Sequence, residues 1–147
     1  MSWIRIWVHL VFSTLNRDPL ITKELKERLF THIRDNALKK DIWLDRTGGG
    51  CEHVHCLISL KGEQTISKVA QLIKGESSLW LNKNYFSHSK FNWQDDYWAV
   101  SVSESHVEQV RSYIENQEDH HKNRTFKEEV DEFMSKYGWS IVNKYKT

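Results

Sequence analysis

Residues 51–60 decide the fold, and they read Cys51-Glu52-His53-Val54-His55-Cys56-Leu57-Ile58-Ser59-Leu60. Successive side chains of a β-strand point to opposite faces of the sheet. One face would carry Val54, Cys56, Ile58 and Leu60, which together make a credible core face. His53 and His55 stand side by side on the other face. The stretch therefore predicts a strand that buries one face and presents two imidazoles on the other.

The sequence on the N-terminal side predicts two partner strands and a helix. A short strand from Ile42 to Arg46, followed by the turn Gly48-Gly49-Gly50, is expected to form a hairpin with residues 51–60. Bulky residues alternate from Ile4 to Phe12, which predicts a long, half-buried strand. A helix is expected from about Thr22 to Lys40, because one helical face carries Leu25, Leu29, Ile33 and Ala37.

The sequence on the C-terminal side completes the pattern. It predicts a helix over 65–82, a polar and aromatic loop over 84–96, and a strand over 98–103. A helix is expected from about His106 to Asp119, and a last one begins at the capping box of Thr125 and Glu128. The order strand, helix, strand, strand, helix, strand is that of the split βαβ fold. It predicts an α+β, ferredoxin-like antiparallel sheet with helices on one face plus C-terminal helices, in a single domain over residues 1–147.

Length and composition exclude several classes of protein. The chain has 147 residues, 39% hydrophobic and 28% charged, so it can bury a core and is not a disordered chain. No run approaches the ~18 apolar residues of a membrane span, and the first residues lack the pattern of a signal peptide. Two cysteines, Cys51 and Cys56, indicate reduced thiols in the cytoplasm. Because the net charge is only +1, nucleic acid would have to be held by local basic patches.

Two parts of the sequence carry groups that could act on a phosphate. His53 and His55 could share one cation, although two histidines on a solvated sheet face would give the same pattern. Tyr113 and Gln117 are four residues apart, so they lie on one face of the predicted helix. Gln117 offers an amide oxygen, which hard cations accept, and Tyr113 offers a phenol, a group that is also common at the edge of a core. Together they would place an open-sided metal beside a phenol able to attack phosphorus.

Several stretches of the chain match the motifs of a known family. They are His9-Leu10-Val11-Phe12-Ser13-Thr14 with Asn16-Arg17, Glu52-His53-Val54-His55, Lys74-Gly75-Glu76-Ser77-Ser78, and Tyr113-Ile114-Glu115-Asn116-Gln117-Glu118-Asp119-His120-His121 with Thr125-Phe126 and Glu128-Glu129. In these stretches the sequence resembles the one-tyrosine HUH transposases of small bacterial insertion sequences, the IS200-like family. Glu52 stands where members often carry Asp, and Cys56 where an aliphatic residue is usual, and both changes are mild.

The resemblance implies a metal-dependent enzyme that nicks and rejoins single-stranded DNA at the ends of its own element. It implies that Tyr113 is the nucleophile, which forms a 5′-phosphotyrosine bond and releases a 3′-hydroxyl. It also implies that His53, His55 and Gln117 hold the cofactor, Mg²⁺ or Mn²⁺. The implied partners are hairpins in single-stranded DNA and a second copy of the chain, in a homodimer whose subunits share their active sites.

Basic and aromatic residues near these stretches are the candidates for DNA contact. Arg17 and Lys74 lie within matching stretches, so we expect them to bind phosphates, although most surface lysines are simply solvated. Trp93, Tyr97 and Trp98 could stack on unpaired bases, but aromatic residues at the edge of a strand more often belong to a core.

Two other functions fit parts of the sequence. A non-catalytic module that binds RNA or single-stranded DNA could use the same sheet, but His53 and His55 stand where its stacking aromatics would be expected. A zinc protein could use Cys51 with the two histidines, since the three alternate on one strand face, but no fourth ligand is evident. The adjacent His120 and His121 would point about 100° apart on a helix, so we do not expect them to share a metal.

Overall fold

A computed structural model describes residues 2–117, 128 and 131–132 of the chain. Its elements follow the predicted order. They are β1 (Ile6–Ser13), η1 (Leu15–Arg17), α1 (Lys23–Lys39), β2 (Trp43–Gly49), β3 (His53–Leu60), α2 (Ile66–Asn84), β4 (Trp98–Val102), η2 (Glu104–His106) and α3 (Val107–Glu115). The helix predicted to begin at Thr125 and the pair His120-His121 lie outside the described residues.

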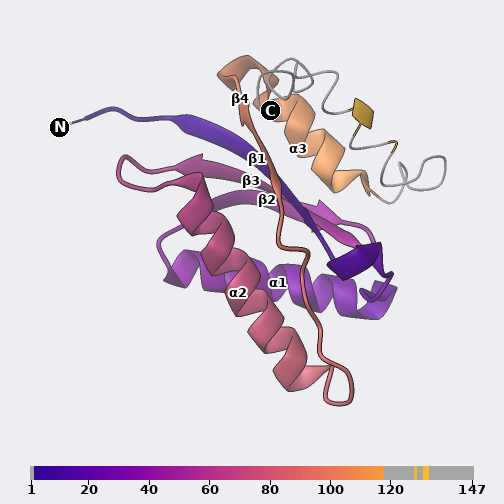
Figure 1. Ribbon diagram of the computed structural model, residues 1–147. Helices are drawn as coiled ribbons and strands as arrows, with labels where there is room; N and C mark the ends of the chain where they lie inside the picture. Colours follow the sequence, from indigo (N-terminus) through magenta and orange to yellow (C-terminus); the bar gives the residue numbers. More distant parts are fainter. Residues whose placement is uncertain (1, 118–127, 129–130, 133–147) are drawn as a thin grey trace, which may run out of the picture.

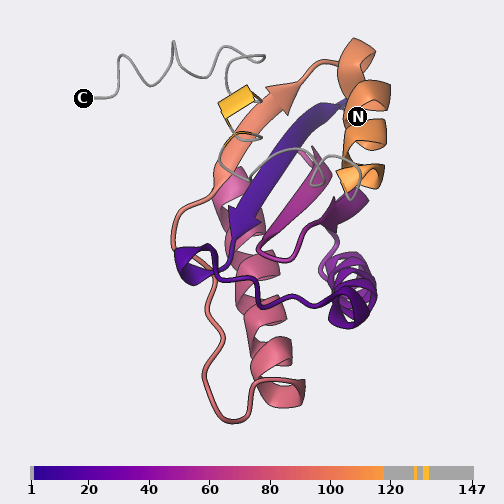
Figure 2. The same ribbon diagram turned by 90° about the vertical axis from the view of Figure 1, so that its right-hand side faces the viewer.

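The four strands form one antiparallel sheet in the order β2-β3-β1-β4. This order, with β1 and β3 in the centre, confirms the predicted α+β, ferredoxin-like fold. Figure 1 shows α1 and α2 below the sheet and α3 above it. Figure 2 shows α1 nearly end-on and α2 from the side, so these two helices cross steeply beneath the strands. The first two helices therefore cover one face, and α3 covers the opposite one.

Apolar side chains fill both sides of the sheet. The larger cluster lies between the sheet and the first two helices, and its fully buried members include Leu10, Phe12, Leu29, Val54, Ile58 and Ala70. The smaller cluster joins Trp7, Leu57 and Val102 of the sheet to Val107, Val110 and Ile114 of α3. Because both faces are covered, every residue of β1 from Trp7 to Ser13 is buried. The prediction of a half-buried first strand is thus wrong along most of its length.

The observed boundaries of α1 and α2 agree to within about two residues with those predicted from the sequence. The side chain of Thr22 accepts a hydrogen bond from the Leu25 N–H, and that of Thr65 accepts one from the Lys68 N–H. Each threonine therefore satisfies one backbone donor that the first turn of a helix leaves without an intrahelical partner. None of the described helices has the length and apolar character needed to cross a membrane.

The hairpin between β2 and β3 is tighter than predicted. Gly48 and Gly49 belong to β2, and the turn consists of residues 50–52, so Cys51 and Glu52 precede the strand rather than begin it. A Cβ atom on Gly49 would lie 2.2 Å from the carbonyl oxygen of His53, and the φ of this residue is +157°. Only glycine fits this close approach, which brings the end of β2 directly beside the start of β3.

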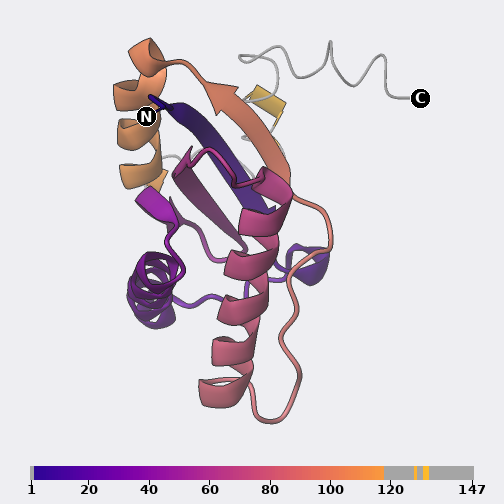
Figure 3. The ribbon, with the colours of Figure 1, turned by 90° about the vertical axis from the view of Figure 1, so that its left-hand side faces the viewer.

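The long segment after α2 returns to the sheet alongside that helix, as Figure 3 shows. Trp93 anchors it: its indole N–H donates to the Ser77 hydroxyl at 3.0 Å, and its ring packs edge-on against Phe12 and Phe91. Trp93 is therefore a core residue, as the alternative reading of this aromatic segment expected. Tyr97 packs in part against the same core, and Trp98 is half-buried in β4.

Candidate functional site

The two histidines of β3 lie on one face of the sheet, as the strand period predicts. Their ring centroids are 4.9 Å apart and the rings meet edge to face. His53 is 0% exposed and His55 is 2% exposed. The interpretation as a solvated surface pair is therefore wrong, because this face of β3 is covered. Two imidazoles withdrawn from water need defined polar partners, and each has one.

Helix α3 brings the predicted tyrosine and glutamine to the histidines. Val110 and Ile114 are buried against the sheet, which turns the face carrying Tyr113 and Gln117 toward β3. The Oε1 atom of Gln117 lies 3.1 Å from Nε2 of His53. The ring centroid of Tyr113 lies 5.6 Å from that of His55. All four residues predicted for the metal and nucleophile positions thus meet in one place.

Two further residues contact the histidines from behind. Oε1 of Glu52 lies 2.7 Å from Nδ1 of His53, and Nε2 of His9 lies 2.9 Å from Nδ1 of His55. Both residues belong to the stretches that match the family's motifs, but the sequence pattern did not predict that either contacts a histidine of β3. The signal for His9 was present, because odd-numbered residues of β1 share a face with His53 and His55 once β1 pairs with β3.

Close packing and ion pairs hold α3 on the sheet. Gly48 lies against α3, where a Cβ would come within 2.7 Å of the Ile114 carbonyl oxygen. Arg111 donates to both carboxylate oxygens of Asp45 at 2.7 and 3.0 Å, a pairing that raises the pKa of the guanidinium. Arg46 donates to Glu115 at 2.8 Å. The helix that carries Tyr113 is therefore fixed to β2 of its own chain.

Replacing Gly48 by alanine is expected to displace α3. The added methyl would collide with backbone rather than with a flexible side chain, so the free energy of unfolding should fall by about 1–3 kcal/mol. Gly75 in the middle of α2 is the matched control, because a Cβ there would meet nothing within 4 Å. Gly75→Ala should instead raise stability by about 0.5–1 kcal/mol. Denaturant unfolding of both variants measures this, and equal effects would contradict the proposed contact.

The facing atoms of His53 and Gln117 fit a divalent cation. Gln117 Nε2 donates to the Tyr113 carbonyl oxygen at 3.1 Å, which turns Oε1 toward His53. If a neutral His53 donates a hydrogen bond from its Nδ1–H to Glu52, then its Nε2 is an acceptor that faces the Gln117 oxygen at 3.1 Å, and the two acceptors need a proton or a cation between them. Neighbouring ligands around octahedral Mg²⁺, at 2.0–2.1 Å from the ion, are about 3 Å apart. The donor set therefore suits such an ion.

The arrangement does not suit the zinc site considered from the sequence. Cys51 lies in the hairpin turn, and its thiol donates to Glu52 at 3.0 Å. Partial desolvation and this carboxylate raise the pKa of Cys51 to about 11. Among the described residues, no three His, Cys, Asp or Glu side chains gather as a metal site. The metal hypothesis thus depends on the Gln117 amide as third ligand.

The two basic residues predicted to contact DNA lie outside this cluster. Arg17 is exposed in η1, directly after β1, where Asn16 and Arg17 have φ values of +59° and +57°. The ammonium of Lys74 donates to the carbonyl oxygens of Gln94 and Asp95 at 2.6 and 2.8 Å. Burial lowers the pKa of Lys74. Lys74 therefore fastens the segment after α2, and its contact with DNA stays a prediction, as does that of Arg17.

Lys74→Met and Arg17→Ala are expected to distinguish a residue that stabilises the fold from a residue that binds DNA. Loss of the two hydrogen bonds made by Lys74 should lower the free energy of unfolding by about 1–2 kcal/mol. Arg17→Ala should leave stability nearly unchanged and weaken single-stranded DNA binding more at low salt than at high salt. Thermal unfolding and a salt series of binding assays measure both. A Lys74→Met protein of full stability would contradict the structural role.

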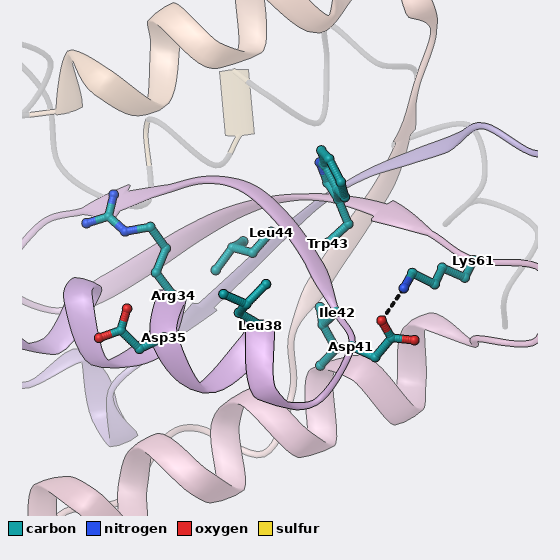
Figure 4. Close-up of a pocket in the computed structure, with 8 residues that line it drawn as sticks. All are labelled: Arg34, Asp35, Leu38, Asp41, Ile42, Trp43, Leu44 and Lys61. Carbon is teal, nitrogen blue, oxygen red and sulfur yellow. Dashed lines mark hydrogen bonds and ion pairs between the residues drawn. The ribbon is translucent and has the colours of Figure 1, made fainter.

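A hollow in the surface lies elsewhere, at the junction of α1 and β2. Figure 4 shows its lining, in which Lys61 pairs with Asp41: Arg34, Asp35, Leu38, Asp41, Ile42, Trp43, Leu44 and Lys61. Trp43 begins β2, whereas Gly48, which contacts α3, lies near its end. None of the predicted site residues lines this hollow, so it is separate from the histidine cluster.

Comparison with known proteins gives consistent results. Residues 2–117 match the family described as Transposase IS200 like. The ISDra2 transposase TnpA of Deinococcus radiodurans is 26% identical over 116 residues, which cover 76% of this chain and 83% of the relative. A crystal structure from the same organism, assigned as a transposase, superposes with a TM-score of 0.64 at 23% identity and covers 79% of this chain and 93% of that one. A REP-associated tyrosine transposase bound to a REP hairpin gives 0.59 at 18% identity, over 82% and 72%.

Proposed function

Because the chain belongs to the IS200-like transposase family, we propose that it cuts and rejoins single-stranded DNA at insertion-sequence ends through a bond between Tyr113 and a 5′-phosphate. The observation that carries this proposal is the meeting of Tyr113, His53, His55 and Gln117 from two separate elements. A module that only binds nucleic acid has no need for these four groups at one point. Their chemistry is that of phosphoryl transfer.

His53, His55 and Gln117 would hold a divalent cation, Mg²⁺ or Mn²⁺. His53 would contribute Nε2, which faces Gln117 Oε1, while its Nδ1 stays with Glu52. His55 would also use Nε2, because its Nδ1 lies against His9. The bound ion would neutralise negative charge on the phosphate while one oxygen replaces another at phosphorus. The protein's own contribution is to hold these three buried ligands together between β3 and α3.

Tyr113 would act as the nucleophile from its position beside His55. Its phenol oxygen forms a bond to phosphorus and loses its proton, while the bond from phosphorus to the 3′ oxygen breaks and that oxygen gains a proton. An isolated tyrosine has a pKa of about 10, so the attack needs the electrostatic help of the neighbouring cluster. The phosphotyrosine bond conserves the energy of the phosphodiester, so a second 3′-hydroxyl can reverse the step without ATP. The ring position beside His55 supports this role.

The substrate proposed is single-stranded DNA that carries hairpins near the cut. The REP-associated tyrosine transposase has a similar fold and is described as bound to a REP hairpin, which supports a hairpin partner for this chain. Because the net charge is only +1, contact with DNA would depend on local residues such as Arg17. We place this activity in the cytoplasm, where two reduced cysteines are expected.

A homodimer with shared active sites is the assembly we propose. In the described chain, Tyr113 lies beside its own His55, so sharing would require α3 to leave the Gly48 contact and dock on the partner. Mixing Tyr113→Phe protein with His53→Asn protein tests this exchange. Restored cleavage in the mixture, with each protein inactive alone, would show that one subunit's tyrosine serves the other's histidines. Continued inactivity of a verified mixed dimer would favour cleavage within one chain.

One experiment tests the proposed activity directly. Single-stranded DNA from both sides of the gene is labelled on the fragment 3′ of the cut and incubated with the protein and Mn²⁺ or Mg²⁺. A denaturing protein gel should then show a labelled band at the summed mass of protein and DNA fragment, and this band should disappear with chelator. Hairpin binding that falls with salt, without any adduct, would instead support the non-catalytic binding module.

A further inference from the structure

A third histidine lies behind the predicted metal ligands. His9 of β1 is 1% exposed, and its Nε2 atom lies 2.9 Å from Nδ1 of His55. The two rings are tilted by 34°, with centroids 5.1 Å apart, so the contact runs from nitrogen to nitrogen rather than ring over ring. It joins the two central strands of the sheet on the face that carries the cluster.

A hydrogen bond between two imidazoles fixes where their protons are. One nitrogen must donate and the other accept, so the pair has two neutral arrangements. If His9 donates from Nε2, then His55 accepts at Nδ1 and carries its own proton on Nε2, where it blocks metal binding. If His55 donates from Nδ1, then His55 Nε2 keeps its lone pair for a cation, and His9 carries its proton on Nδ1.

We propose that His9 is a positioning residue, which holds His55 in the tautomer that binds metal by accepting a hydrogen bond from the Nδ1–H of His55 at its own Nε2. This inference rests on the proposed function of His55. Metal-binding histidines commonly donate their second ring N–H to a carboxylate, a carbonyl or water, and that partner fixes the orientation of the ring. Here an imidazole from the neighbouring strand takes this place.

The other ligand histidine has a partner of the more usual kind. Glu52 lies 2.7 Å from His53 Nδ1 and accepts a hydrogen bond from it, so both imidazoles are held through Nδ1 and both would use Nε2. A carboxylate can only accept, whereas an imidazole can accept or donate. His9 is therefore the one of the two partners whose own tautomer decides whether the ligand is competent. The position calls for an acceptor, and a glutamine could supply one through its side-chain oxygen.

The test is Mn²⁺ binding to the full chain, measured by calorimetric titration without DNA. His9→Leu fills the buried site but removes the acceptor, and it should weaken Mn²⁺ binding by about 10- to 100-fold. His9→Gln restores an acceptor and should return the affinity close to wild type. His32→Leu is the matched control, because His32 pairs with Glu76 on the helical side and should have no effect on Mn²⁺. Circular dichroism verifies that each variant is folded.

A second measurement on the wild-type protein does not depend on any variant folding. In ¹⁵N-edited NMR spectra of the Mg²⁺-loaded chain, His9 should carry its proton on Nδ1. A proton on His9 Nε2, or equal Mn²⁺ affinity of folded His9→Leu and wild type, would overturn the role of His9 while leaving the metal site intact. A wild-type chain that binds no Mn²⁺ would overturn the proposed metal site together with this inference.

Discussion

The Tyr113→Phe protein is expected to form no covalent adduct with DNA and to cleave at least about 10³-fold more slowly than wild type. Phenylalanine lacks the oxygen that would attack phosphorus, so no other change is needed to remove the reaction. The ring remains in place, and its edge contacts with His55 and His9 at 5.6 and 6.3 Å between centroids should survive. Fold and hairpin affinity should therefore change little. The labelled-fragment gel and a binding titration with the same DNA measure the two quantities.

Tyr85 provides the matched control for the loss of a hydroxyl. Its phenol oxygen accepts a hydrogen bond from Arg28 at 3.2 Å at the end of α2, away from the histidine cluster. Tyr85→Phe also removes one hydroxyl from a tyrosine, but it should cleave DNA at the wild-type rate. An adduct formed by Tyr113→Phe would assign the nucleophile to another residue. Loss of hairpin binding together with cleavage would mean that Tyr113 acts in DNA binding.

Much of the fold could be predicted because its signals are local. The start of α1 near Thr22, the start of α2 near Thr65 and the alternation in β3 depend only on neighbours in sequence, and the structure confirms them. The burial of β1 on both faces depends on α3, which is about a hundred residues later in the chain, so the period of β1 alone could not reveal it. The hairpin turn lies later in the chain than predicted because Gly48 and Gly49 still pair with His55 and Val54 of β3, a pairing that the glycine run alone does not reveal.

The candidate site shows the same division between local and distant information. The spacing of His53 with His55, and of Tyr113 with Gln117, gives the correct faces of a strand and a helix. The distances between these pairs depend on how α3 docks, which no local pattern specifies. His9 could have been found by pairing β1 with β3 in the predicted topology, which places it diagonally beside His55. Its hydrogen bond depends on side-chain geometry, so it required the structure.

The second large effect is expected when the metal ligands are removed while their outer partners are kept. His53→Asn and His55→Asn each retain a polar group near the Nδ1 position, which can still contact Glu52 or His9, and each removes Nε2. Loss of an outer partner alone costs about 10- to 100-fold in metal affinity or activity, so loss of a ligand should lower cleavage by more than about 100-fold. Initial cleavage rates at saturating DNA, over a series of Mn²⁺ concentrations, measure this effect.

The concentration series separates metal binding from folding. Both histidines are buried, so either substitution leaves a small cavity and should lower stability by about 1–2 kcal/mol. A stability loss does not depend on Mn²⁺, whereas a weakened metal site should recover part of its activity as Mn²⁺ is raised. His32→Asn, which removes an imidazole stacked on Trp80, reproduces the loss of a ring far from the cluster and should cleave normally. Full activity of a folded His53→Asn or His55→Asn protein at low Mn²⁺ would show that the substituted histidine is not a metal ligand. In the case of His53, the Gln117 oxygen that faces it would then have no ion to share with it.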